Sequence, residues 1–166
     1  LKQKKIGHTG TLDPDAEGVL PVCLGKATKL CDMLTDKDKT YETVLLLGQV
    51  TDTQDISGQI LEEHSTGHLT EEMVREAILS FAGEYDQIPP MYSALKVNGK
   101  KLYELAREGK EVERKPRKVT IYQIVIKEIN LPRVRMEVKC SKGTYIRTLC
   151  HDIGMKLKCG GCMESL

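Results

Sequence analysis

The sequence has few features of membrane-bound or nucleotide-dependent proteins. Its apolar runs fall far short of the roughly 18 residues that a membrane-spanning helix needs, and no secretory signal pattern is visible. It also lacks the Gly-x4-Gly-Lys-Ser/Thr pattern of phosphate-binding loops and the Gly-x-Gly-x-x-Gly pattern of dinucleotide-binding folds. We therefore expect no membrane partner and no cofactor.

The sequence has six cysteines, Cys23, Cys31, Cys140, Cys150, Cys159 and Cys162, and neither a secretory signal nor a complete set of metal ligands accompanies them. Without a secretory signal, free thiols in a reducing compartment are expected, so we expect a cytoplasmic protein. The Cys159-Gly-Gly-Cys162 spacing is that of zinc knuckles. However, a second ligand pair is missing, and Cys150 and His151 on a helix would point about 100° apart. We expect buried thiols and no metal site, with a zinc or redox site as the alternative.

The charge distribution is uneven although the formal net charge is only +1. Residues 50–90 carry nine acids and one base, whereas residues 96–118 carry nine bases and four acids. Residues 119–166 carry eight bases and four acids. A basic second half can form one basic face, which suits a polyanionic partner. The length of 166 residues is sufficient for one domain with a substantial core.

Periodicity and turn residues predict alternating strands and helices. Strands are expected over residues 19–24, 39–48, 119–129 and 134–140, the first of them buried. Helices are expected over residues 27–34, 69–82, 101–108 and 144–157. In the second helix Thr70 is the expected cap, and the expected buried stripe is Met73, Ala77, Ile78 and Phe81. Asp52 and Asp55 lie in a polar loop, where turn and capping roles are expected rather than cation binding.

The stretch Gly-His-Thr-Gly-Thr-Leu-Asp-Pro, residues 7–14, carries the first chemical signal. Its glycines permit turns and close approach of a ligand. Pro14 moves Asp13 away from helical conformation, toward an extended backbone. A carboxylate displayed on such a loop can be a nucleophile or a general base. An ordinary Asp-Pro turn explains the same residues, so both interpretations remain open.

Three longer motifs resemble those of TruB-type tRNA pseudouridine synthases. They are residues 7–29, residues 87–96 (Gln-Ile-Pro-Pro-Met-Tyr-Ser-Ala-Leu-Lys) and residues 140–148 (Cys-Ser-Lys-Gly-Thr-Tyr-Ile-Arg-Thr). The motifs come in the family's order and close to its spacing. The resemblance implies an α+β fold with a mixed, mainly antiparallel sheet flanked by helices. It also implies a single catalytic domain over residues 1–166, truncated at both ends, with an RNA-gripping insertion at about 87–118.

The same resemblance implies isomerisation of the T-loop uridine of tRNA to pseudouridine, with base flipping. Asp13 would be the essential nucleophile or base, and Arg147 would hold its carboxylate in a bidentate ion pair. Tyr41 would stack on the target uracil. From the residues alone, Tyr41 is equally a core aromatic of a strand, and Arg147 a surface arginine. A cation in the first turn of a helix is unfavourable, however, which indicates an anionic partner for Arg147.

RNA contacts are expected where basic side chains alternate with tyrosines. His8 would pack against the opened RNA loop, unless it is only a hydrogen-bonded loop histidine. The other expected RNA-binding residues are Lys29, Tyr92, Lys96, Lys100, Lys101, Lys115, Lys142 and Tyr145. The expected partner is the T stem-loop of tRNA, bound by a monomer. The main alternative is a tRNA-binding or tRNA-folding module without catalysis.

Overall fold

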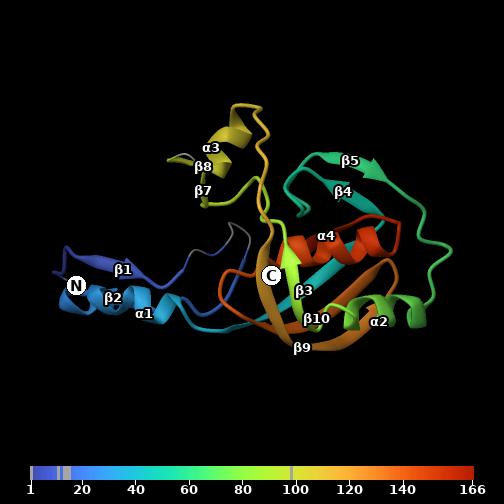
Figure 1. The fold of residues 1–166 in the computed structure, drawn as a ribbon. Coiled ribbons are helices and arrows are strands. Elements are labelled where there is room, and N and C mark those ends of the chain that lie inside the picture. The colour runs from blue at the N-terminus through green and yellow to red at the C-terminus, as the bar shows by residue number, and fades with distance from the viewer. Residues whose placement is uncertain (1, 11, 13–15, 98) are drawn as a thin grey trace.

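The computed structural model describes residues 2–10, 12, 16–97 and 99–166. A five-stranded antiparallel sheet lies at its centre, with strand order β11-β3-β10-β9-β6 (Figure 1). Its strands are β3 Lys39–Leu47, β6 Gly83–Gln87, β9 Arg117–Asn130, β10 Arg133–Cys140 and β11 Gly161–Ser165. The expected α+β fold with a mainly antiparallel sheet is therefore confirmed.

Alternation along β10 determines which face of the sheet is buried. Four alternate residues of this strand are fully buried, namely Val134, Met136, Val138 and Cys140. Side chains two apart on a strand share one face, as the sequence pattern predicts. The opposite face is charged, and there Arg135 pairs with Glu42 on β3 and with Glu128 on β9. The core thus lies on one side of the sheet.

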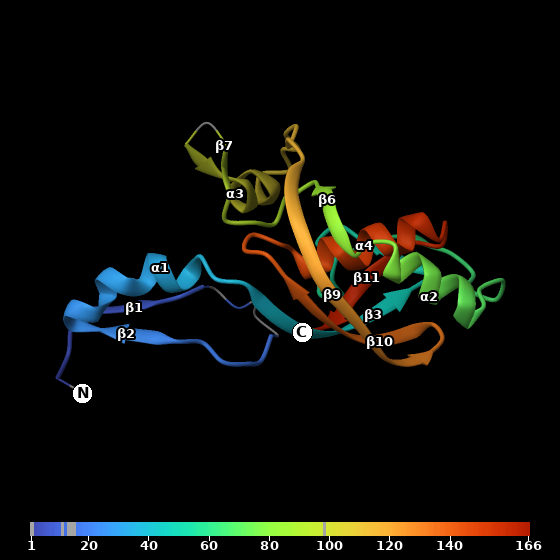
Figure 2. The same cartoon turned by 60° about the horizontal axis from the view of Figure 1, so that its bottom comes forward.

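Two helices cover the buried face, α2 Glu71–Leu79 and α4 Ile146–Lys156 (Figure 2). α4 packs against β11 and β3, and α2 packs against β9. Leu149 and Ile153 of α4 and Leu45 of β3 are fully buried in the shared core. The N-terminal end of α4 is consequently fixed over the sheet, which matters for the arginine in its first turn.

Thr70 caps α2 as predicted, because its side-chain oxygen accepts a hydrogen bond from the backbone N–H of Met73 at 3.3 Å. The buried residues of α2 are Val74, Ala77 and Ile78, whereas Met73 is 44% exposed. The prediction of a buried Met73 is therefore wrong. The pattern allowed two neighbouring stripes, and packing against β9 selects the one that contains Val74.

The N-terminal part forms an arm that extends away from the sheet in both views (Figures 1 and 2). Its elements are β1 Ile6–His8, β2 Val22–Leu24, η1 Gly25–Leu30 and α1 Cys31–Thr35. The predicted burial of residues 19–24 is wrong: Cys23 is buried, but Val19 is 93% exposed. β2 pairs with β1 in a separate hairpin rather than within the central sheet, so one face of it stays open.

A basic insertion follows β6 and leads back into β9. Its elements are β7 Lys96–Val97, β8 Lys100–Lys101 and α3 Leu102–Arg107. The predicted short helix is confirmed, and Gly109 beyond it has a φ of 70°, the left-handed conformation in which glycine commonly ends helices. Leu102 and Leu105 are buried, so the insertion has a small core of its own.

β4 Gln49–Thr51 and β5 Ile60–Glu63 form a second hairpin beside the sheet. In the turn between them, Oδ1 of Asp52 accepts a hydrogen bond from the N–H of Gln59 at 2.8 Å. Oδ1 of Asp55 accepts one from the N–H of Ser57 at 3.0 Å. The turn and capping roles predicted for the two carboxylates are therefore confirmed.

β11 has no counterpart among the predicted strands. Its residues, Gly-Cys-Met-Glu-Ser, include no β-branched or aromatic side chain, so strand propensity gives no signal. β11 pairs with β3 only from Leu47 to Val44. The stretch of β3 from Lys39 to Thr43 therefore has β10 as its strand neighbour on one side and has no ladder pairing with β11 on the other.

Candidate active site

The part of β3 that extends beyond β11 borders two cavities, of about 390 Å³ and about 520 Å³. Thr40 and Tyr41 of this strand line both of them. The strand supplies a rigid floor because β10 pairs with it through Lys39. A concave site at the edge of a sheet is a usual place for a ligand.

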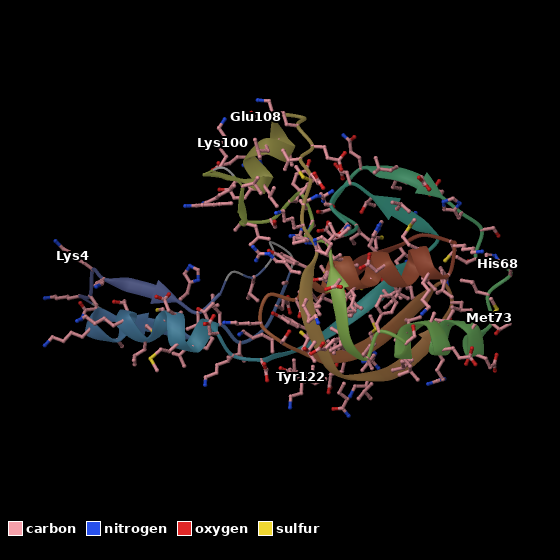
Figure 3. All side chains as sticks on the ribbon, in the orientation of Figure 1. Lys4, His68, Met73, Lys100, Glu108 and Tyr122 are labelled. Atoms are coloured by element: carbon pink, nitrogen blue, oxygen red, sulfur yellow. The ribbon has the colours of Figure 1, made fainter. Side chains whose placement is uncertain are left out.

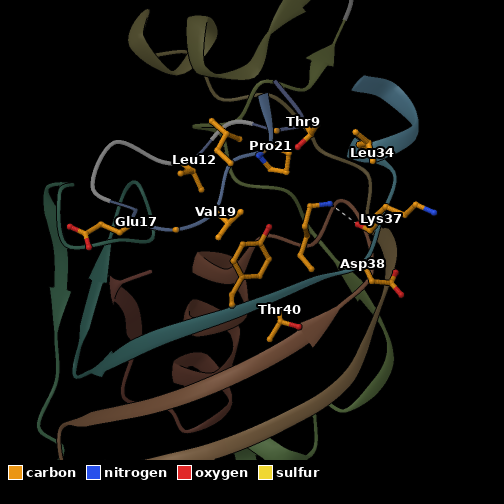
Figure 4. A pocket seen from close by; sticks show the side chains of 14 residues that line it. Thr9, Leu12, Glu17, Val19, Pro21, Leu34, Lys37, Asp38 and Thr40 are labelled. Carbon is orange, nitrogen blue, oxygen red and sulfur yellow. Dashed lines mark hydrogen bonds between the residues drawn. The ribbon is translucent and has the colours of Figure 1, made fainter. Parts of the chain in front are cut away.

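The opposite wall comes from described residues of the first sequence motif, namely Thr9, Gly10, Leu12 and residues 17–21. Figure 4 shows Leu12 and Val19 across the cavity from Thr40. The backbone N–H of Thr9 donates to the carbonyl oxygen of Pro21 at 3.2 Å, so these two residues are held together. Described residues of the motif thus lie against β3.

Asp13, the predicted nucleophile or base, lies outside the described residues. Leu12 lines both cavities, and Ala16 lines the larger one. The described residues on either side of Asp13 in the sequence therefore border the same site as Tyr41. The ion pair expected between Asp13 and Arg147 stays a prediction.

Tyr41 lies where the core meets the two cavities, and its stacking on a uracil stays a prediction. It packs against the hydrophobic core, where it is partly buried, and it also lines both cavities. Thr43, two residues further along the same face, is fixed by a hydrogen bond from its hydroxyl to the carbonyl of Ser165 at 2.7 Å. The ring of Tyr41, at the border between the core and the cavities, offers a surface on which a planar base can stack.

Arg147 lies in the first turn of α4 and is only 8% exposed. Its Nη2 donates to the backbone carbonyl of Tyr92, and its Nη1 donates to that of Thr53 at 3.5 Å. Nη1 also lies 3.6 Å from Oδ2 of Asp55. The expectation of an anionic partner is thus supported. The guanidinium joins three segments: α4, the β4–β5 turn and the entry of the insertion.

Asp55 is the functional candidate that the sequence interpretation missed. One carboxylate oxygen closes the turn, as predicted, but the other faces Arg147. The preceding residue, Gln54, has a φ of 65°, and its side-chain oxygen accepts a hydrogen bond from the hydroxyl of Thr148 at 2.6 Å. The turn is therefore attached to α4 through two adjacent helix residues. No local pattern gives this, because the residues meet only in the folded protein.

Three of the predicted RNA-binding lysines lie together on the β7–β8 hairpin of the insertion. Lys96, Lys100 and Lys101 lie on the β7–β8 hairpin, and Lys101 lies 5.3 Å from the ring centre of Tyr103. Figure 3 shows Lys100 and Glu108 together on the insertion, and their charged atoms are 4.0 Å apart. Glu108 also pairs with Lys110 at 2.7 Å, so part of the positive charge is balanced locally.

Lys115, on the segment that leads from the insertion back to β9, lines a cavity of about 280 Å³ together with Lys96. Arg114 in the same cavity donates from Nη1 to the carbonyl oxygen of Pro89 at 3.2 Å. This contact joins the exit of the insertion to its entry. Tyr92, on the entry side, presents its backbone to Arg147 rather than its ring.

The remaining predicted RNA contacts are dispersed. His8 is exposed at the end of β1, and its Nδ1 is hydrogen-bonded to the carbonyl of Gly10. Lys29 lies on η1 of the arm. Lys142 pairs with Asp36 at 2.8 Å, an ion pair that joins the β10–α4 connection to the end of α1. The hydrogen bond of His8 agrees with the loop-histidine alternative.

Burial dominates the chemistry of the cysteines. Five of the six are buried, and Cys31 is half-buried. Burial raises the pKa of the Cys150 thiol to about 12 and that of Cys162 to about 11. In the described part of the chain no group of three His, Cys, Asp or Glu side chains is arranged to hold a metal ion.

Among the described residues, no helix has the length and apolar character to cross a membrane.

The chain is similar in sequence to one family over most of its length. Residues 1–146 match the family described as "TruB family pseudouridylate synthase (N terminal domain)". The tRNA pseudouridine synthase B of Alkaliphilus oremlandii is 59% identical over 166 residues, covering 100% of this chain and 55% of the relative. That of Lachnoclostridium phytofermentans is 64% identical over 174 residues, covering 100% of this chain and 56% of the relative. The chain spans about half the length of these curated relatives.

Solved structures agree with these relatives. A Cbf5-Nop10-Gar1 complex contains a chain with a TM-score of 0.73 and 32% identity, over 98% of this chain and 39% of that one. An H/ACA RNP bound to a substrate RNA containing 2′-deoxyuridine gives a TM-score of 0.69 at 28% identity, over 98% of this chain and 37% of that one. The similarity in fold to these chains therefore accompanies the similarity in sequence to the pseudouridine synthases.

Proposed function

The chain belongs to the TruB family of pseudouridylate synthases, and from this premise we propose that it is the catalytic part of an enzyme that converts the T-loop uridine of tRNA to pseudouridine. The observation that carries the proposal is the cavity beside Tyr41. It and the larger cavity next to it are lined by β3 and by described residues of the first motif; Leu12 borders both cavities and Ala16 the larger one.

The reaction is an isomerisation, so atoms and electrons balance without a redox partner. The bond between N1 of uracil and C1′ of ribose breaks, and a bond between C5 and C1′ forms. C5 releases its proton to solvent, and N1 takes up a proton in exchange. In this proposal Asp13 is the nucleophile or the base. Arg147 holds and orients the carboxylates around it, because a guanidinium donates several hydrogen bonds in a fixed plane. No cofactor is required.

The target base must leave its stack to enter the cavity. Base flipping costs a few kcal/mol, and less in a loop than in a duplex. Tyr41 offers a stacking surface for the uracil, and His8 would pack against the opened loop. Phosphate contacts from Lys96, Lys100, Lys101 and Lys115 on the insertion would offset the cost.

The remaining expected contacts come from all three motifs. They are Lys29 on the arm, Lys142 and Tyr145 before α4, and Tyr92 on the entry of the insertion. For Lys142, RNA binding requires that a phosphate replaces Asp36 as the partner of its ammonium group. We propose that the protein acts as a monomer in the cytoplasm on the T stem-loop.

Tritium release from tRNA labelled at uracil C5 tests this function. The complete gene product that carries these residues is compared with its Asp13→Asn variant. We expect release by the first, and RNA binding without release by the second. Substantial turnover by Asp13→Asn would remove Asp13 from the reaction. Binding without release by both proteins would favour a tRNA-binding module.

A further inference from the structure

Gln87 forms an unusual set of contacts for a side chain outside the cavities described above. It is the last residue of β6 and is only 1% exposed. Its Oε1 accepts a hydrogen bond from the backbone N–H of Tyr145 at 2.8 Å, and its Nε2 donates to the carbonyl oxygen of the same residue at 3.0 Å. Nε2 also donates to the hydroxyl of Tyr85. A single buried amide thus holds both polar groups of one backbone residue.

Tyr145 is the residue at which α4 begins. It is the N-cap, its φ of −98° and ψ of 110° are extended, and its own side chain makes no capping hydrogen bond. The first N–H groups of a helix have no partner within the helix, so the direction in which the helix starts depends on such outside contacts. Gln87 therefore sets the backbone from which α4 departs.

Arg147 lies two residues after Tyr145, in the first turn of the helix. Because an α-helix rises only about 1.5 Å per residue, Arg147 lies close to the cap. A shift of the Tyr145 backbone therefore also shifts Arg147. The contacts of its guanidinium with Asp55 at 3.6 Å and with the Thr53 carbonyl at 3.5 Å leave little tolerance for such a displacement.

A second contact joins the same two segments. From Gln87 the chain continues to Tyr92, whose carbonyl oxygen accepts a hydrogen bond from Nη2 of Arg147. The segment from Gln87 to Tyr92 therefore holds the start of α4 at one end and the guanidinium at the other. Loss of the amide at Gln87 leaves the N–H of Tyr145 without this partner at a half-buried place, which costs free energy unless the backbone moves. The carbonyl of Tyr145 loses one of its hydrogen bonds and keeps the one from the N–H of Leu149 at 3.1 Å.

We propose that Gln87 is a positioning residue for the proposed isomerisation: it fixes the start of α4 so that Arg147 reaches Asp55, Thr53 and Tyr92. This inference rests on the proposed function, since the consequence is catalytic. Gln87 touches neither the substrate nor the reacting atoms and acts through Tyr145 and Arg147.

The test compares Gln87→Met with Tyr85→Phe in the complete gene product. Methionine keeps the length of the side chain but removes both hydrogen bonds to Tyr145. Tyr85→Phe removes a hydrogen bond of Gln87 at the same buried place and leaves the two bonds to Tyr145 intact. We expect Gln87→Met to lower kcat at least about tenfold with KM for tRNA within about twofold, because misplacing a catalytic group by about 1 Å can cost about a hundredfold in rate. Tyr85→Phe should retain kcat within about twofold.

Hydrogen exchange supplies a readout that does not depend on activity. The amide of Tyr145 should exchange faster in Gln87→Met than in the native protein or in Tyr85→Phe. If Gln87→Met does not fold, Gln87→Glu serves instead, because it keeps an acceptor for the Tyr145 N–H and loses the amide donor; its kcat should lie below that of the native protein.

The outcomes separate this inference from the proposed function. Native kcat in Gln87→Met, or in Gln87→Glu where only that variant folds, overturns the positioning role while tritium release by the native protein still supports the isomerase. Equal losses of kcat in Gln87→Met and Tyr85→Phe also overturn it, since a general loss of packing then explains both. If the native protein releases no tritium, the function fails, and unchanged exchange at Tyr145 would independently contradict the role of Gln87.

Discussion

Nη1 of Arg147 lies 3.6 Å from Oδ2 of Asp55, and both side chains are largely withdrawn from solvent, at 9% and 15% exposure. A cation in the first turn of a helix is unfavourable with respect to the helix dipole. The carboxylate of the β4–β5 turn compensates for this placement. The pair also joins the turn to α4, and Arg147 is the proposed partner of Asp13, so loss of the pair should affect both stability and activity.

Asp55→Asn should separate these two roles. Asparagine still accepts the hydrogen bond from the N–H of Ser57, so the turn should persist, but Arg147 loses the charge of its partner. We expect kcat for tritium release to fall about tenfold or more, with a loss of about 1 kcal/mol in the free energy of unfolding. Asp52→Asn is the matched control, because Asp52 closes the same turn through Gln59. An equal loss of kcat in the control would assign the effect to the turn alone.

Neutralising Lys100, Lys101 and Lys115 together should weaken tRNA binding and reduce its salt dependence. Each phosphate contact that is lost removes about 0.7 to 0.9 from the slope of log K against log salt. Filter binding at several salt concentrations measures the slope. The control replaces Lys127, Lys139 and Lys158, three exposed lysines outside the insertion. A slope that changes only in the control would show that the RNA contacts another surface.

Gly154→Ala should destabilise the protein although alanine favours helices. A Cβ at this position would lie 2.2 Å from the backbone nitrogen of Gly161 and 2.3 Å from the carbonyl carbon of Gly160. α4 and β11 would have to separate, at a cost of about 2 kcal/mol or more. Urea unfolding measures this cost. Gly67→Ala, where a Cβ would meet only Ser65 Oγ at 3.6 Å, should change the stability by less than about 0.5 kcal/mol. Similar stabilities of the two variants would contradict the close packing.

Asp152→Asn should raise the melting temperature at neutral pH but not in acid. Burial raises the pKa of the Asp152 carboxyl from 3.8 to about 6. The folded state therefore binds this proton more tightly than the unfolded state, and the stability contributed below about pH 4 is lost as the pH rises through about 6. The difference in melting temperature between the variant and the native protein should appear across this interval. A difference that is independent of pH would argue against a buried, titrating carboxylate.

Much of the fold follows from local sequence. The alternation of Val134, Met136 and Val138 predicts β10, and the cap at Thr70 predicts α2, because both patterns depend on residues close together in the chain. The motifs likewise indicated that Tyr41 lies at the site, and the helix dipole indicated a partner for Arg147. Asp13 remains a prediction, since it lies outside the described residues.

The sequence by itself therefore determined β3, β9 and β10 of the central sheet, the helices that cover it, the family and the expectation that Arg147 has an anionic partner; β6 and β11 were not predicted. The tertiary structure alone decided that Asp55 faces Arg147, that Gln87 holds the start of α4, that Val74 rather than Met73 is buried, and that the arm exposes its apolar residues. The physical reason is the same in each case. Periodicity and capping act between neighbours in the chain, whereas burial and pairing depend on which distant segments the completed sheet brings into contact.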